Sequence, residues 1–154
     1  MTKILFVCHG NICRSPMAEF VMKDLILQSG LSKDVFINSA ATTREAIGGD
    51  VHPGTREVLR AHGVPFTKRQ ARQITREEYS AYDMIVAMDA ENLRDLSYMT
   101  GGDPDKKVRL LLAFAGEDRD VADPWYTGDF EATFRDVRLG CTAILNELQK
   151  RRRS

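Results

Sequence analysis

The chain has 154 residues, and its 22 Lys and Arg residues balance 22 Asp and Glu residues to give a formal net charge of zero. A chain of this length buries roughly two-thirds of its unfolded surface, so it can fold without disulfides or metal ions. Zero net charge argues against non-specific binding to nucleic acid or anionic membranes, and the lack of any run of 18 apolar residues argues against a membrane span.

The cysteine pattern argues against a disulfide scaffold and against a zinc site. The three cysteines are an odd number, none lies in a Cys-X-X-Cys pair, and the three histidines are scattered. The apolar stretch at the N-terminus is too short for a signal peptide. We therefore expect a cytoplasmic protein with reduced thiols, no metal and no cofactor.

Signals for strands and helices alternate along the chain. Continuous apolar runs predict buried strands, and longer stretches with an apolar face predict helices. We expect one domain over residues 1–150, with a frayed basic tail at 151–154. In chain order we expect a strand at 3–7, a helix from 15 to near 30, a strand at 35–39, helices at 55–62 and 75–82, a strand at 83–88, a helix at 90–96, a strand at 107–112, a loop at 117–129 and a helix at 130–148.

Two of these helices have predicted start signals. Ser15 and Pro16 are expected at the N-cap and first position of the first long helix, with Glu19 in its first turn. Thr75 and Glu78 form a predicted capping box. Strands separated by helices predict βαβ units in one doubly wound α/β domain with a mostly parallel sheet, where ligands bind beyond the carboxyl ends of the strands.

The loop after the first strand has the pattern Cys8, five residues, Arg14 and Ser15. A loop of this length can turn its N–H groups inward as an anion-binding nest, and the following helix adds its positive end. Arg14 can grip two phosphate oxygens in fork geometry. A thiol held in such a positive field favours the thiolate form, so Cys8 is expected to be a nucleophile.

Other residues of this loop have expected supporting roles. Ser15 can donate a hydrogen bond to the Cys8 sulfur, and the Asn11 amide can hold an unusual backbone conformation. An arbitrary Cys and Arg at this spacing would be a core thiol and a surface charge, but the strand before the loop and the helix start after it favour an anion site. The loop matches neither the Walker A nor the dinucleotide fingerprint. The remaining members of the phosphate-binding loop are His9, Gly10, Ile12 and Cys13.

A phosphate ester bound there needs an acid to protonate its leaving oxygen. Asp123 is the candidate, because Pro124 stiffens its loop and the aromatic Trp125 and Tyr126 beside it can wall a substrate slot. From the residues alone, Asp89 and Asp120 remain alternatives to Asp123.

At this point the chain resembles the low-molecular-weight protein-tyrosine phosphatases over nearly its whole length. The resemblance implies a three-layer, flavodoxin-like domain with a four-stranded parallel sheet. It also implies phosphotyrosine proteins, peptides and small aryl phosphates as substrates, inhibition by phosphate-like oxyanions, and a monomer or weak dimer. The matching segments are 7–16, 38–40, 71–73, 88–89 with 92–93, and 123–124.

The resemblance also implies the roles of individual residues. Cys8 would be the nucleophile, Arg14 the phosphate clamp, and Asp123 the general acid that then acts as base on a phosphocysteine intermediate. Asn11, Ser15 and Ser39 match the residues that support the loop by hydrogen bonds. Cys13 matches a second loop thiol that can form a reversible disulfide with Cys8.

The sequence departs from the family at several positions around the site. Arg69 stands where many members carry a histidine that supports the loop. Arg44 and Glu45 stand where eukaryotic members often have an aromatic residue, and His9 stands where an apolar residue is common. The expected pocket walls are therefore His9, Ile12, Arg44, Glu45, Trp125 and Tyr126.

Three other functions are weighed on the same fold. Protein-arginine phosphatases carry a Thr at the position of Ile12, which favours phosphotyrosine here. Thioredoxin-linked arsenate reductases need two further cysteines near mid-chain, and this sequence has none between Cys13 and Cys141. A phosphotyrosine-binding module without turnover has little support, because Cys8, Arg14 and Asp123 are all present.

Overall fold

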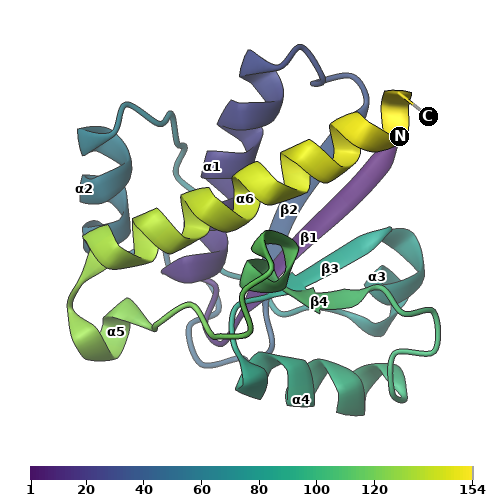
Figure 1. The fold of residues 1–154 in the computed structure, drawn as a ribbon. Helices are drawn as coiled ribbons and strands as arrows, with labels where there is room; N and C mark the ends of the chain where they lie inside the picture. Colours follow the sequence, from purple (N-terminus) through teal and green to yellow (C-terminus); the bar gives the residue numbers. More distant parts are fainter. Residues whose placement is uncertain (154) are drawn as a thin grey trace.

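A computed structural model of the protein describes residues 1–153 and shows the expected α/β fold. Four parallel strands are arranged in the order β2-β1-β3-β4, with helices on both faces of the sheet (Figure 1). The elements are β1 (Thr2–Cys8), α1 (Arg14–Gln28), β2 (Val35–Ala41), α2 (Pro53–Ala61), α3 (Arg76–Ala81), β3 (Met84–Ala87), α4 (Ala90–Thr100), β4 (Val108–Leu110), the 3-10 helix η1 (Leu111–Ala115), α5 (Pro124–Thr127) and α6 (Phe130–Arg153).

Strand β1 has a continuous apolar sequence because both of its faces are buried. Side chains alternate between the faces of a strand. Ile4 and Phe6 lie in the larger hydrophobic cluster, which is completed by α1, α2 and α6. Leu5 and Val7 lie in the smaller cluster under α3 and α4. Both layers therefore pack against the strand that ends at Cys8.

The strand order leaves a crevice at the carboxyl end of β1. The chain leaves β1 for β2 on one side, and β3 pairs with β1 on the other side. The carboxyl end of β1 is therefore a switch point, where a doubly wound sheet leaves a crevice. The loop that begins at Cys8 occupies this crevice. Within residues 1–153, no helix is long and apolar enough to cross a membrane.

The predicted N-cap and first position of the first helix, Ser15 and Pro16, are wrong by two residues. Helix α1 begins at Arg14, and its N-cap residue, Cys13, makes no side-chain cap. Ser15 lies inside the helix because its hydroxyl contacts the Cys8 sulfur instead of capping the backbone. Glu19 lies beyond the first turn and is buried, so it does not serve the helix dipole there. The capping box of α3 is confirmed, with the Thr75 N–H donating to Glu78 at 2.9 Å.

The C-terminal third differs from the prediction at three places. Strand β4 ends at Leu110, because the chain turns into η1. The expected loop at 117–129 contains the short helix α5. The basic tail is not frayed up to Arg153, because α6 continues through it and Arg152 pairs with Asp34 at 2.9 Å. Cationic side chains in a last helical turn also suit the helix dipole. Ser154 lies outside the described residues.

The close contact between α6 and η1 predicts that one added methyl group lowers the stability of the fold. A Cβ atom on Gly140 would clash with the Leu111 side chain, which is fully buried. We expect Gly140→Ala to lower the free energy of unfolding by about 1–3 kcal/mol through overpacking. Urea denaturation checks this expectation. Thr142→Ala on the exposed face of the same helix is the control, and equal stability of both variants would contradict the packing.

Candidate active site

The Cys8 sulfur lies at the centre of a ring of hydrogen-bond donors. The backbone N–H groups of Asn11 and Ser15 point at it from 3.3 and 3.4 Å, and the Ser15 hydroxyl lies 3.0 Å away. Cys8 is 3% exposed. These donors converge on the sulfur from two residues of one loop. The loop therefore surrounds the sulfur with hydrogen-bond donors, as an anion-binding nest does.

Asn11 sets the shape of this loop. It has a backbone φ of 60° and is fully buried, a conformation that non-glycine residues seldom adopt. Its amide nitrogen donates to the hydroxyls of Ser15 and Ser39, at 2.8 and 3.0 Å. Its amide oxygen accepts from Arg69 Nη2 at 2.7 Å and from the Arg72 N–H at 3.2 Å. Four hydrogen bonds thus hold the left-handed turn.

Arg69, which departs from the family pattern, supports the loop directly. Besides its bond to the Asn11 amide, its Nη1 donates to the Asn11 carbonyl oxygen at 3.2 Å. Its Nε lies 3.6 Å from Glu19, a carboxylate that also accepts from the Ser39 hydroxyl. Burial lowers the pKa of Arg69 from its ordinary value, although Glu19 opposes that shift. Sequence reasoning missed Glu19, whose signal was a carboxylate on an otherwise apolar stretch of helix.

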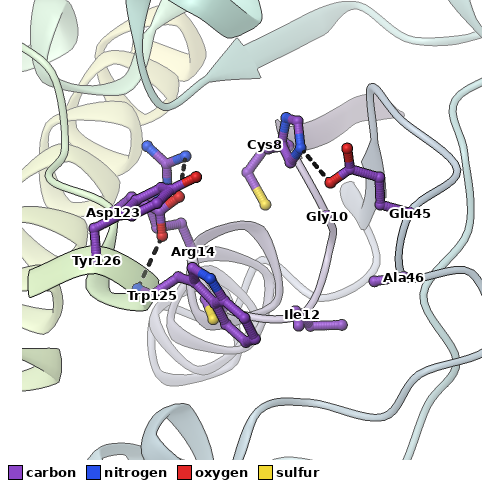
Figure 2. A pocket seen from close by; sticks show the side chains of 11 residues that line it. Cys8, Gly10, Ile12, Arg14, Glu45, Ala46, Asp123, Trp125 and Tyr126 are labelled. Atoms are coloured by element: carbon purple, nitrogen blue, oxygen red, sulfur yellow. Dashed lines mark hydrogen bonds and ion pairs between the residues drawn. The ribbon is translucent and has the colours of Figure 1, made fainter. Parts of the chain in front are cut away.

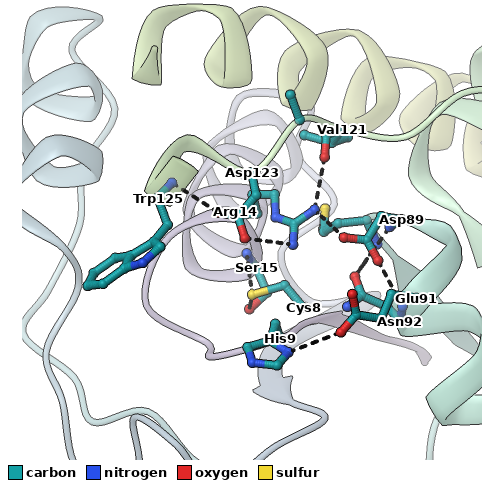
Figure 3. A network of polar contacts seen from close by, with 12 residues as sticks. Cys8, His9, Arg14, Ser15, Asp89, Glu91, Asn92, Val121, Asp123 and Trp125 are labelled. Atoms are coloured by element: carbon teal, nitrogen blue, oxygen red, sulfur yellow. Dashed lines mark hydrogen bonds and ion pairs between the residues drawn. The ribbon is translucent and has the colours of Figure 1, made fainter. Parts of the chain in front are cut away.

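Arg14 is buried and tethered on the acidic side of the pocket (Figure 3). Its Nη1 donates to Asp89 at 2.7 Å and to the Val121 carbonyl at 2.9 Å, and its Nη2 lies 3.4 Å from Asp123. Burial disfavours its charge, yet Cys8, Asp89 and Asp123 together raise the pKa of Arg14. The guanidinium therefore stays charged beside the sulfur.

The three candidate acids have different positions. Asp89 caps α4 by accepting from the Asn92 N–H at 2.8 Å, and its other oxygen orients Arg14. Asp120 accepts from the Ala90 N–H at 3.1 Å and does not line the pocket. Asp123 caps α5 through the Trp125 N–H at 3.0 Å, and it lines the pocket with a second oxygen near Arg14. Of the three, Asp123 is placed to reach a bound ester.

A pocket of about 250 Å³ opens over Cys8 (Figure 2). Its walls are mostly apolar, and Trp125 and Tyr126 stand at its exposed rim. Arg44, expected in the wall, is exposed and does not line the pocket, whereas Ala46 does. Ser39 lies behind the loop. The lining residues are Cys8, His9, Gly10, Ile12, Cys13, Arg14, Glu45, Ala46, Asp123, Trp125 and Tyr126.

His9 closes one side of the pocket mouth. Its Nε2 lies 2.7 Å from Glu45 and its Nδ1 lies 3.7 Å from Glu91. These contacts account for an acidic rim opposite the aromatic one. Within residues 1–153, no three His, Cys, Asp or Glu side chains gather as a metal-holding group.

The second thiol of the loop differs chemically from Cys8. Cys13 is buried, and burial together with the neighbouring Cys8 raises the pKa of Cys13 to about 12. It is therefore protonated at neutral pH and does not compete with Cys8 as a nucleophile. All three cysteines are free, and Cys141 is fully buried in α6, as expected of a core thiol.

Comparison with known proteins agrees with this geometry. A profile of the family described as low molecular weight phosphotyrosine protein phosphatase matches residues 3–154. The chain is 41% identical to low molecular weight protein-tyrosine-phosphatase YfkJ of Bacillus subtilis, over 97% of each chain. The crystal structure of YfkJ matches with a TM-score of 0.94 at 40% identity, covering 98% of this chain and 96% of that one.

Two further relatives extend the comparison. The low molecular weight phosphotyrosine protein phosphatase of Sus scrofa is 36% identical over 95% of each chain. The crystal structure of a Drosophila arginine phosphatase matches at 30% identity with a TM-score of 0.88, covering 96% of this chain and 98% of that one.

The bracing of Asn11 predicts a measurable effect of Arg69→Met. This change removes two charged donors from a buried residue, and such hydrogen bonds contribute about 1.5–3 kcal/mol each. We expect lower stability and at least tenfold weaker binding of inorganic phosphate, measured by calorimetry. Lys68→Met on the adjacent exposed residue is the control. Unchanged phosphate affinity in Arg69→Met would contradict the bracing role.

Proposed function

The chain belongs to the low molecular weight phosphotyrosine protein phosphatase family, and we propose that it hydrolyses phosphotyrosine monoesters through a phosphocysteine intermediate. One observation carries the proposal: the Cys8 sulfur lies on the floor of a pocket, ringed by donors, with Arg14 and Asp123 beside it. The apolar walls suit a phenyl ring, and the loop suits its phosphate.

In the first step the Cys8 thiolate attacks phosphorus and the bond to the phenolic oxygen breaks. Arg14 and the inward N–H groups of the loop bind the equatorial oxygens, where charge develops. Asp123, in its protonated form, donates its proton to the leaving oxygen. General acids of this kind typically contribute roughly 100- to 10,000-fold in rate.

In the second step the same groups reverse their roles. Asp123 is now a carboxylate and takes a proton from the water that attacks the phosphocysteine. The sulfur–phosphorus bond breaks, inorganic phosphate forms and Cys8 returns to the thiolate. The Ser15 hydroxyl stabilises the departing sulfur, since its oxygen accepts from Asn11 and its proton can point at Cys8, 3.0 Å away, in preference to the Ala40 carbonyl oxygen at 3.5 Å.

Phosphoarginine is the second candidate substrate, because one structural neighbour is titled an arginine phosphatase. Ile12 favours phosphotyrosine, since its apolar side chain lines the pocket where arginine phosphatases carry a Thr. Arsenate reduction lacks support, because Cys141 is too deeply buried to relay a disulfide from Cys8.

The proposal includes a location and an assembly state. A phosphatase whose nucleophile is a free thiol works best in a reducing compartment, so we assign it to the cytoplasm. We assign residues 1–150 to one catalytic domain that acts as a monomer or weak dimer. Phosphate-like oxyanions are expected to inhibit it by occupying the loop.

The roles of Cys8 and Asp123 predict distinct kinetic signatures. Cys8→Ser should abolish hydrolysis of aryl phosphates measured in EDTA. Asp123→Asn should lose roughly 100-fold or more with basic leaving groups, and far less with good ones, because only the former need a proton. Asp120→Asn is the matched control. Activity retained in Cys8→Ser, or equal losses across the leaving groups in Asp123→Asn, would overturn the mechanism.

The wall residue Ile12 predicts substrate preference. The wild-type protein should hydrolyse a phosphotyrosine peptide faster than the matched phosphoarginine peptide. Ile12→Thr should shift the ratio towards phosphoarginine, because a hydroxyl can bond the polar guanidino group that an apolar wall leaves unsatisfied. Phosphate release from both peptides is the measurement. A wild-type preference for phosphoarginine would reassign the substrate.

A further inference from the structure

His52 joins the two loops that carry the proposed catalytic residues. Its backbone N–H donates to the Ile12 carbonyl oxygen in the phosphate-binding loop at 2.8 Å. Three residues later, the Thr55 hydroxyl donates to the Cys13 carbonyl oxygen at 3.3 Å. The N-terminal end of α2 is therefore fixed to the phosphate-binding loop by two hydrogen bonds.

The His52 ring is held in one orientation. It is the N-cap of α2, with Nδ1 accepting from the Gly54 N–H at 3.0 Å. Its face stacks on Phe130, the first residue of α6, with ring centroids 5.0 Å apart and planes 21° apart. A Cβ on Gly54 would come 2.5 Å from the Phe130 ring, so this close packing requires glycine. The ring is thus clamped between α2 and α6.

The clamped ring also meets the ring of Trp125, which belongs to the acid-bearing segment. The His52 and Trp125 rings meet at 83° with centroids 5.8 Å apart. In residues 1–153 this is the one aromatic contact of the Trp125 ring, which is otherwise 62% exposed. The backbone N–H of Trp125 donates to the Asp123 carboxylate at 3.0 Å. Figure 1 shows α2, α5 and the start of α6 gathered on the same side of the molecule.

We propose that His52 is a positioning residue that sets the place of Asp123 relative to Cys8. A chain of contacts runs from the phosphate-binding loop through the His52 ring to Trp125 and Asp123. This inference rests on the proposed function and deepens it, since it names what holds the acid over the pocket. His52 itself touches no reacting atom.

His62 offers a matched control at the other end of α2. It also stacks on α6, with its ring 4.0 Å from that of Phe134, and it pairs with Glu131. It contacts neither Trp125 nor the phosphate-binding loop. A general loss of packing between α2 and α6 affects both histidine variants, whereas loss of acid positioning affects His52 alone.

Two substitutions separate the aromatic contact of His52 from its capping of α2. His52→Asn keeps a capping oxygen but has no ring, and His52→Phe keeps a ring but cannot cap. An aromatic edge contact affects an equilibrium by roughly two- to tenfold. We expect kcat of His52→Asn to fall by roughly two- to tenfold for basic leaving groups. The kcat for good leaving groups and the inhibition by phosphate should change little. His52→Phe and His62→Ala should keep the wild-type dependence on leaving group.

Trp125, the single tryptophan of the sequence, gives a second readout that is independent of activity. Acrylamide should quench its fluorescence more strongly in His52→Asn than in the wild type, His52→Phe or His62→Ala. A wild-type leaving-group dependence and wild-type quenching in folded His52→Asn would overturn the positioning role. A wild-type protein inactive on every aryl phosphate would instead overturn the proposed function.

Discussion

The site depends on the left-handed turn at Asn11. This turn brings two backbone N–H groups and one hydroxyl onto the Cys8 sulfur, and an ordinary loop between β1 and α1 would point them elsewhere. A buried asparagine at positive φ is costly unless every polar atom has a partner. Its partners come from α1, β2 and the segment around Arg69, so the nest for the phosphate is built by the whole domain.

Other elements of the fold supply the carboxylates and contacts that position Arg14 and Asp123. The carboxyl end of β3 supplies Asp89, which holds Arg14 from behind and leaves Asp123 at the pocket wall. The N-terminal end of α2 binds the phosphate-binding loop and meets Trp125 through His52. The proposed nucleophile and clamp share the loop between β1 and α1, whereas the proposed acid comes from the segment before α5, so the distance between acid and nucleophile is set by packing between helices. Rigid packing of this kind is what preorganised catalysis needs.

Local patterns predict the four strands, the longer helices and the loop from Cys8 to Ser15, because strand, nest and helix start are consecutive in sequence, but they miss α5 and η1. They failed where a distant partner decides. Ser15 was predicted as a cap, but the sulfur seven residues earlier takes its hydroxyl. The roles of Glu19 and His52 do not follow from local sequence, since their partners lie on other elements. The basic C-terminal segment is helical because α6 packs along α1 and η1, which composition alone does not reveal.

The central claim is that the phosphoryl group passes through the Cys8 sulfur, and trapping that intermediate tests it most directly. An aryl phosphate with a good leaving group should give a burst of about one equivalent of phenol per protein on rapid mixing. After acid quenching and digestion, mass spectrometry should place the phosphate on Cys8. Steady turnover with no burst and no phosphorylated Cys8, or phosphate on another residue, would contradict the account.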